Sequence, residues 1–129
     1  MKSMILRNSL YTISDKRTEG KSILYQILLD RNHFIYKAHF PNEPITPGVC
    51  IIQIAKELLE DHLCGEYEIS FVKNIKFLSV LSPLSTPSVT YAFDKITVLP
   101  ESNGCKTQIQ VQQDDVLFAK LSIIFKKSQ

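Results

Sequence analysis

The run from His39 to Glu57, HFPNEPITPGVCIIQIAKE, constrains the fold of this chain more than any other stretch. Pro47 suits the first position of a helix because its φ is fixed, and Gly48 lets another group approach the backbone closely. Apolar residues then recur at helical spacing, which predicts a helix over residues 48–64 with Gly65 as its C′ residue. The first half of this helix is apolar on nearly every face. We therefore expect other structure to bury that half, and solvent to reach the second half.

Strand-like segments lie on both sides of the helix. Their bounds are 22–30 before it and 68–80, 88–98, 105–113 and 116–126 after it. Residues 4–13 fit a strand or a short helix equally well, and residues 15–21 are typical of a loop. Hairpin turns are predicted at Asn103-Gly104 and Asp114-Asp115. One helix followed by an antiparallel meander predicts an α+β fold, a curved antiparallel sheet wrapped around one long central helix.

Composition favours a globular domain over a nucleic-acid-binding or membrane protein. With 129 residues, 44% of them hydrophobic and 22% charged, we expect one globular domain spanning 1–129. A net charge of +2 with scattered Lys and Arg argues against nucleic-acid binding. No apolar stretch approaches the roughly 20 residues that span a bilayer, so a cytoplasmic location without membrane contact is expected. Three cysteines without C-x-x-C spacing predict neither disulfides nor a metal site.

His39 is the candidate catalytic base. Pro41, Pro44 and Pro47 stiffen the segment that joins it to the helix, and an imidazole titrates near neutral pH. The first N–H groups of a helix lack intrahelical acceptors, so the Gly48 N–H can stabilise an oxygen that gains negative charge. By contrast, His33 and His62 lack such surroundings, and we expect ordinary, partly exposed histidines there.

The segment HFPNEPITPGV resembles the signature of the β-hydroxyacyl-(acyl carrier protein) dehydratases, whose pattern is roughly H-F-P-G-x-P-x-x-P-G-V followed by a helix. The flanking runs NHFIYKAHFP and FVKNIKFLSVLSP also resemble that family, so the resemblance covers most of residues 30–83. It implies the hotdog fold and a role in fatty-acid biosynthesis without cofactor or metal. It further implies a thioester on acyl carrier protein as substrate, His39 as base, and Gly48 N–H as donor to the thioester carbonyl.

The sequence differs from the family's pattern at the position of the catalytic carboxylate. There, the histidine works with a carboxylate fourteen positions later, on the helix of the partner subunit, in a run resembling E-A-x-A-Q. This chain reads Gln53-Ile54-Ala55-Lys56-Glu57. The Gln53 carboxamide can hydrogen-bond a substrate but has no proton to donate near neutral pH. Glu57 lies one turn on along the same helical face; it is either a displaced acid or, as we favour, a residue of the solvated half without catalytic role.

Three functions therefore remain open. The chain acts on or binds β-hydroxyacyl thioesters as a dehydratase, with His39, Gly48, Gln53 and Glu57 as candidate site residues. Alternatively, it is a catalytically impaired subunit paired with a glutamate-containing homologue, or an acyl thioesterase. We expect a homodimer for the chain alone, because the last strand carries a second apolar face at Val116, Phe118 and Ile124. A Cys50 nucleophile is rejected, since thiols on apolar helix faces are usually inert.

Overall fold

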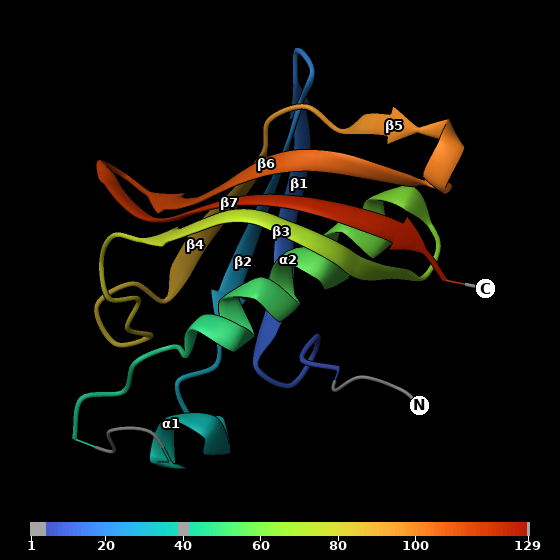
Figure 1. Ribbon diagram of the computed structural model, residues 1–129. Helices are drawn as coiled ribbons and strands as arrows, with labels where there is room; N and C mark the ends of the chain where they lie inside the picture. Colours follow the sequence, from blue (N-terminus) through green and yellow to red (C-terminus); the bar gives the residue numbers. More distant parts are fainter. Residues whose placement is uncertain (1–4, 39–41, 129) are drawn as a thin grey trace.

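A computed structural model of the chain describes residues 5–38 and 42–128 (Figure 1). Its elements are β1 (Tyr11–Glu19), β2 (Ser22–Leu29), α1 (Phe34–Ala38), α2 (Gly48–Leu63), β3 (Tyr67–Phe77), β4 (Ser88–Phe93), β5 (Thr97–Leu99), η1 (Pro100–Ser102), β6 (Gly104–Gln113) and β7 (Val116–Lys127). The α+β class expected from the sequence is confirmed.

All the strands belong to one antiparallel sheet with the order β1-β2-β4-β6-β7-β3, and β5 pairs with β6 beside this path. The expected meander is right for β4, β6 and β7 but wrong for β3, which pairs with β7 and forms an edge. Backbone N–H groups of Leu78 and Ser79 donate to the Phe118 carbonyl, so the chain stays beside β7 past the end of β3. A long connection then returns it to β4 on the other side of β6.

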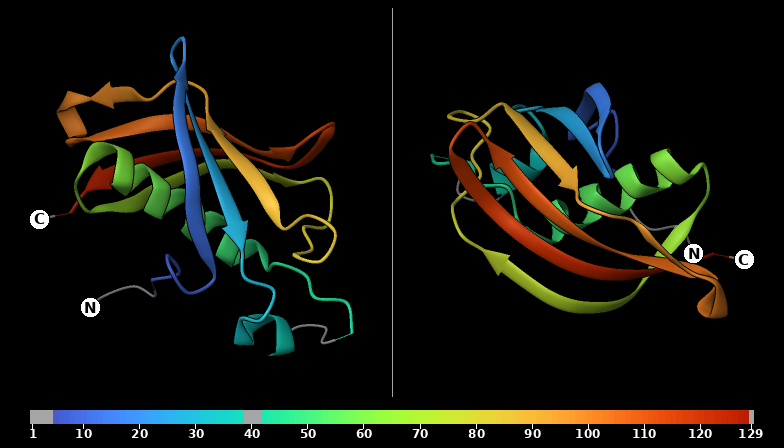
Figure 2. Two further views of the ribbon diagram at one scale, coloured as in Figure 1. Left: turned by 180° about the vertical axis from the view of Figure 1, so that it is seen from behind. Right: turned by 90° about the horizontal axis from the view of Figure 1, so that it is seen from above.

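The sheet curves around α2, which lies on its concave face (Figure 2). The helix has 16 residues and ends at Leu63, one residue before the predicted end at Cys64. The expectation of a long central helix is not confirmed. Its buried apolar stripe against the sheet consists of Cys50, Ile51, Ile54, Ala55, Leu58 and Leu59. The alternating apolar faces predicted for β4, β6 and β7 supply most of the opposing core.

The predicted burial of α2 is right for most of its first half but wrong for Val49 and for the second half. Val49 in the first turn is 76% exposed, whereas Glu57 in the second half is only 8% exposed. The second half is covered because the N-terminal segment hydrogen-bonds to it, as described below. Apolar composition at the start of the helix therefore marks a surface that no described part of this chain covers.

Tyrosine hydroxyls from three strands fasten the sheet to α2. The pairs are Tyr91 Oη to Ile51 O at 2.9 Å, Tyr11 Oη to Glu57 Oε1 at 2.9 Å, and Tyr25 Oη to Asp61 Oδ2 at 2.6 Å. Burial raises the pKa of each tyrosine, and the neighbouring carboxylates raise the pKa of Tyr11 and Tyr25 further. All three phenols therefore stay protonated and serve as donors along the helix.

The N-terminal hairpin differs from expectation. Residues 15–21, predicted as a loop, belong largely to β1, which runs to Glu19 and pairs with β2 across a turn at Gly20. Gly20 has φ +61°, a conformation that favours glycine. The outer part of β1 is solvent-exposed on both faces, so its charged sequence has no apolar alternation to indicate a strand.

Two further local predictions need correction. The left-handed residue that ends α2 is Cys64, with φ 55°, and not Gly65. Phe118 is the extra residue of a β-bulge between β6 and β7, so its side chain turns inward and is only 4% exposed. The outer apolar face expected on β7 is reduced accordingly. The turns at Asn103 and Asp114 are confirmed, with φ 55° and 53°.

Candidate functional site

The start of α2 forms one wall of the candidate site. Pro47 is the N-cap in extended conformation, and Gly48 is the first helical residue, so its N–H has no acceptor within the helix. A Cβ at position 48 would lie 2.7 Å from Cζ of the Phe77 ring. Glycine is therefore required here unless the ring moves, and the helix start and the end of β3 lie in direct contact.

A pocket of about 390 Å³ opens between these two elements. Pro47, Gly48 and Ile51 line one side, and residues 77–81 line the other. Most of the lining is apolar, with the Thr46 and Ser79 side chains as exceptions. Such a pocket suits an apolar chain next to a polar group that faces the helix start.

His39 lies outside the described residues, but both flanks of it are placed. Before it, α1 is a short helix that sequence analysis missed; the His33 Nδ1 accepts the Ile35 N–H at 3.1 Å and caps its start. After it, the buried Thr46 hydroxyl hydrogen-bonds the Tyr36 hydroxyl at 2.9 Å. This bond ties α1 to the segment that enters α2. His33 is partly exposed, as expected, and its role as a helix cap is visible only in the structure.

Gln53 and Glu57 are in direct contact. Gln53 Nε2 donates to Glu57 Oε2 at 2.9 Å, and the Gln53 side chain is half-buried. One face of α2 therefore carries a glutamine followed by a glutamate, whereas the dehydratases that the sequence resembles carry a glutamate followed by a glutamine. Because a carboxylate only accepts hydrogen bonds, it is the amide nitrogen of Gln53 that must face Glu57.

The Glu57 carboxylate is buried and fully bonded, which corrects its expected place on a solvated half of the helix. Oε2 accepts the Leu6 N–H at 2.8 Å as well as Gln53 Nε2. Oε1 accepts the Arg7 N–H at 2.8 Å and the Tyr11 hydroxyl at 2.9 Å. These four donors match the lone-pair capacity of a carboxylate. Glu57 thus fastens the N-terminal segment and β1 onto α2.

Sequence reasoning could not have found these partners. Two of the four donors are backbone N–H groups far away in sequence, and backbone donors leave no side-chain signal. Tyr11 lies in residues 4–13, a segment whose pattern fits a strand or a short helix equally well. The single available sign was a glutamate on the same helical face as Gln53.

Other candidates behave as ordinary core or surface groups. Cys50 is 5% exposed and burial raises the pKa of its thiol, which agrees with the rejection of a nucleophilic role. Burial and Lys16 lower the pKa of His62, which is half-buried. Residues 5–38 and 42–128 contain no His, Cys, Asp and Glu cluster able to hold a metal ion. No helix in those ranges is both long and apolar enough to cross a membrane.

Comparison with known protein families shows to which family the chain belongs. The sequence model of the ApeI-like family, described as ApeI dehydratase, matches residues 15–119. The chain belongs to the ApeI-like dehydratase family. The dehydratase resemblance of the 39–57 run is thereby confirmed. No curated protein sequence matches the chain.

Solved structures show the same fold as this ApeI-like protein. A chain of the dehydratase heterocomplex ApeI:P from Xenorhabdus doucetiae superimposes with TM-score 0.65 at 17% identity, over 89% of this chain and 96% of that one. An uncharacterised protein from Erwinia carotovora subsp. atroseptica gives 0.58 at 16%, over 88% and 90%. The proposed thioesterase yhdA from Lactococcus lactis gives 0.58 at 12%, over 92% of each chain. At these identities the likeness establishes the hotdog-like fold alone.

Proposed function

We propose that this ApeI-like chain binds β-hydroxyacyl thioesters of acyl carrier protein and works as a dehydratase subunit that takes its catalytic acid from a glutamate-containing homologue. The observation that carries the proposal is the Gln53–Glu57 contact. Position 53 holds an amide that cannot donate a proton in acid catalysis, and the neighbouring carboxylate of Glu57 is bonded to the N-terminal segment.

In this proposal the elimination of water uses a base from this chain and an acid from the partner chain. His39 removes the proton α to the thioester carbonyl, and the Gly48 N–H donates to the carbonyl oxygen as that oxygen gains negative charge. The electron pair of the broken C–H bond forms the α,β double bond as the bond to the β-hydroxyl breaks. The hydroxyl leaves as water after it receives a proton from the partner's carboxylic acid. No cofactor or metal is needed in this scheme.

Gln53 orients the substrate in the site that lacks an acid. Its Nε2 donates to Glu57, and this bond fixes the rotation of the amide plane on the buried side of α2. An oriented amide can hydrogen-bond a β-hydroxyl without protonating it. This site would therefore retain binding while losing the 10²–10⁴-fold acceleration that is typical of general acid–base assistance.

The free edge of the sheet supports a partner. Within residues 5–38 and 42–128, β3 pairs with β7 on one side and with no strand on the other, so its other side offers backbone donors and acceptors. Large apolar side chains follow this edge and the helix start, with exposures of 58% for Phe71, 51% for Phe77, 52% for Leu78 and 76% for Val49. Phe77 also lines the candidate pocket. A homologous subunit on this edge would cover the site, and the similar ApeI:P structure is a heterocomplex.

The thioesterase alternative has one supporting observation, the fold shared with yhdA. The thioesterase hypothesis needs a carboxylate or an equivalent group on the helix that activates water. Gln53 has no basic atom for this step, and Glu57 is committed to four donors. We therefore rank thioester hydrolysis below dehydration.

Product analysis of the purified chain tests the proposal. A β-hydroxyacyl thioester is supplied, and enoyl thioester and free thiol are quantified separately, with and without a glutamate-containing dehydratase homologue. We expect little enoyl product from the chain alone, more in the mixture, and no thiol. Rapid dehydration by the chain alone would refute the need for a partner's acid, and thiol release in place of enoyl product would establish the thioesterase.

A further inference from the structure

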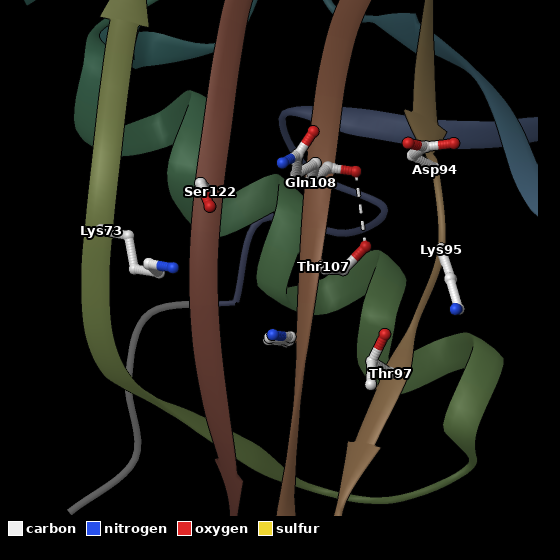
Figure 3. Close-up of a pocket in the computed structure, with 8 residues that line it drawn as sticks. Lys73, Asp94, Lys95, Thr97, Thr107, Gln108 and Ser122 are labelled. Atoms are coloured by element: carbon white, nitrogen blue, oxygen red, sulfur yellow. Dashed lines mark hydrogen bonds between the residues drawn. The ribbon is translucent and has the colours of Figure 1, made fainter.

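A second pocket lies on the outer face of the sheet, on the side away from α2 (Figure 3). Its volume is about 260 Å³. Three lysines on three different segments line it: Lys73 on β3, Lys95 in the link from β4 to β5, and Lys106 on β6. Because the candidate acyl site opens at the start of α2, the two pockets are separate sites.

The lining carries excess positive charge. Three lysines and a single acidic residue, Asp94, are among its lining residues. Among the residues that the structure describes, the ion pairs are Arg7–Asp61, Arg17–Glu19 and Lys56–Glu60, and no lysine of this pocket takes part in one. Like charges around one concavity repel one another, and a bound anion would relieve that repulsion.

An irregularity in the backbone of β3 directs the Lys73 side chain toward the pocket. Lys73 is the extra residue of a β-bulge, because Val72 pairs with Ile123 while Asn74 already pairs with Ser122. Bulges redirect side chains out of the regular alternation. In Figure 3 the Lys73 side chain extends toward β7, above the strands and toward the middle of the pocket.

Neutral hydrogen-bonding groups complete the lining. Thr97, Ser122 and Gln108 add two hydroxyls and an amide to the lining (Figure 3). The Asp94 N–H donates to the Gln108 carbonyl at 2.9 Å and fixes the upper wall. Lysine ammonium groups with nearby hydroxyls and amides are common phosphate ligands.

We propose that this outer pocket binds the phosphate group of a small phosphorylated ligand. Its volume accommodates a phosphate or diphosphate, and falls short of the 300–1,000 Å³ that is usual for larger ligands. The assignment is independent of the acyl site, since no residue is shared between the two pockets. Asp94 at the rim disfavours broad polyanionic surfaces and favours a compact anion.

Titration calorimetry with inorganic pyrophosphate, at constant ionic strength set with NaCl, tests the site. Lys73→Gln and Lys106→Gln each remove one charge from the pocket. Lys76→Gln and Lys120→Gln are matched controls, because these exposed lysines face each other across β3 and β7 but do not line the pocket. Circular dichroism verifies that all four variants fold.

We expect pyrophosphate to bind the wild-type chain, and each pocket variant to weaken binding about tenfold, which corresponds to roughly 1.4 kcal/mol. The two control variants should change the Kd less than twofold. Titration with ADP separates the sources of the phosphate: tighter binding than pyrophosphate indicates a nucleotide, and weaker or equal binding indicates a free phosphate or diphosphate. Equal losses in all four variants, or no binding by the wild type, would overturn the assignment.

Discussion

Gln53 Nε2 donates a hydrogen bond to Glu57 Oε2 at 2.9 Å, one helical turn along α2. The related dehydratases that the sequence resembles carry an acid and an amide in the reverse order. This chain therefore keeps a polar pair on the same helical face but places its charge one turn further from the helix start. At that position the Glu57 carboxylate binds the N-terminal segment. Gln53, which lies nearer the candidate pocket along α2, has no proton to donate in acid catalysis.

Glu57→Gln should destabilise the fold. The amide keeps one acceptor oxygen and replaces the other with an NH₂ group. That group then meets either the Leu6 N–H and Gln53 Nε2 or the Arg7 N–H and Tyr11 hydroxyl, all of which donate to Glu57 in the wild type. Loss of charge-assisted bonds at a buried site predicts roughly 2–4 kcal/mol of lost unfolding free energy. Urea denaturation measures it. Glu66→Gln, at an exposed position, should change stability by no more than about 0.5 kcal/mol.

Gln53→Glu should raise dehydratase activity at least tenfold. It restores a proton donor at the family's position, and two carboxyl groups in hydrogen-bonding contact share one proton, so the pair holds an acid near neutral pH. Initial rates with a β-hydroxyacyl thioester across pH measure the gain. The gain should shrink at alkaline pH as the shared proton is lost.

The double variant Gln53→Glu, Glu57→Gln recreates the order of the related enzymes and serves as a second arm. We expect it to be active yet less stable than Gln53→Glu, because it also removes the carboxylate that accepts the Leu6 and Arg7 N–H groups. If both variants fold and dimerise but remain inactive on acyl chains of several lengths, the pocket has lost more than its acid. The proposed division of labour between subunits would then be wrong.

Thiol labelling should distinguish the three cysteines. Cys64 is exposed at the end of α2, whereas Cys50 and Cys105 are buried and burial raises the pKa of both thiols. We expect one rapidly alkylated thiol in the native protein and three in urea. Peptide mapping by mass spectrometry identifies the fast site. Preferential labelling of Cys50 would contradict its inert role and reopen the nucleophile hypothesis.

Asp61 should make stability depend on acid pH. Burial alone would raise the pKa of this carboxyl, but hydrogen bonds from Tyr25 and Arg7 outweigh it and hold the pKa below the usual 3.8. A depressed pKa stabilises the fold above the unfolded value, so this contribution disappears as pH falls below about 3.8. Urea midpoints measured across this range should decline less steeply in Asp61→Asn, with Tyr25→Phe intermediate. An unchanged slope in Asp61→Asn would refute this assignment.

Local patterns predicted the fold well where burial and periodicity agree. Alternation in β6 and β7 indicated their buried faces, and the helical spacing after Pro47 indicated α2 nearly to the residue. The pattern failed where solvent covers both faces, as in β1, and where a bulge reverses alternation, as at Phe118. The place of β3 beside β7 depends on long-range pairing that no local pattern contains.

In the candidate site, too, local sequence predicted some features, whereas others depend on tertiary contacts. A motif of prolines and glycine indicated the helix start at Gly48, because those residue types are required by the local backbone. The surroundings of Glu57 were mispredicted, since composition showed a charged half-helix while tertiary contacts bury that residue under the N-terminal segment. The loss of the family's acid at Gln53 was readable from sequence, but its bond to Glu57 needed the structure.

Subunit complementation tests the central claim, that the working site joins His39 of one chain to an acid at position 53 of another. The wild-type chain carries the histidine without the acid, and the double variant His39→Ala, Gln53→Glu carries the acid without the histidine. Neither should dehydrate a β-hydroxyacyl thioester alone, whereas mixed dimers, verified by native mass spectrometry, should contain one complete site and turn over substrate. Mixed dimers that form and remain as inactive as their parents would contradict the account.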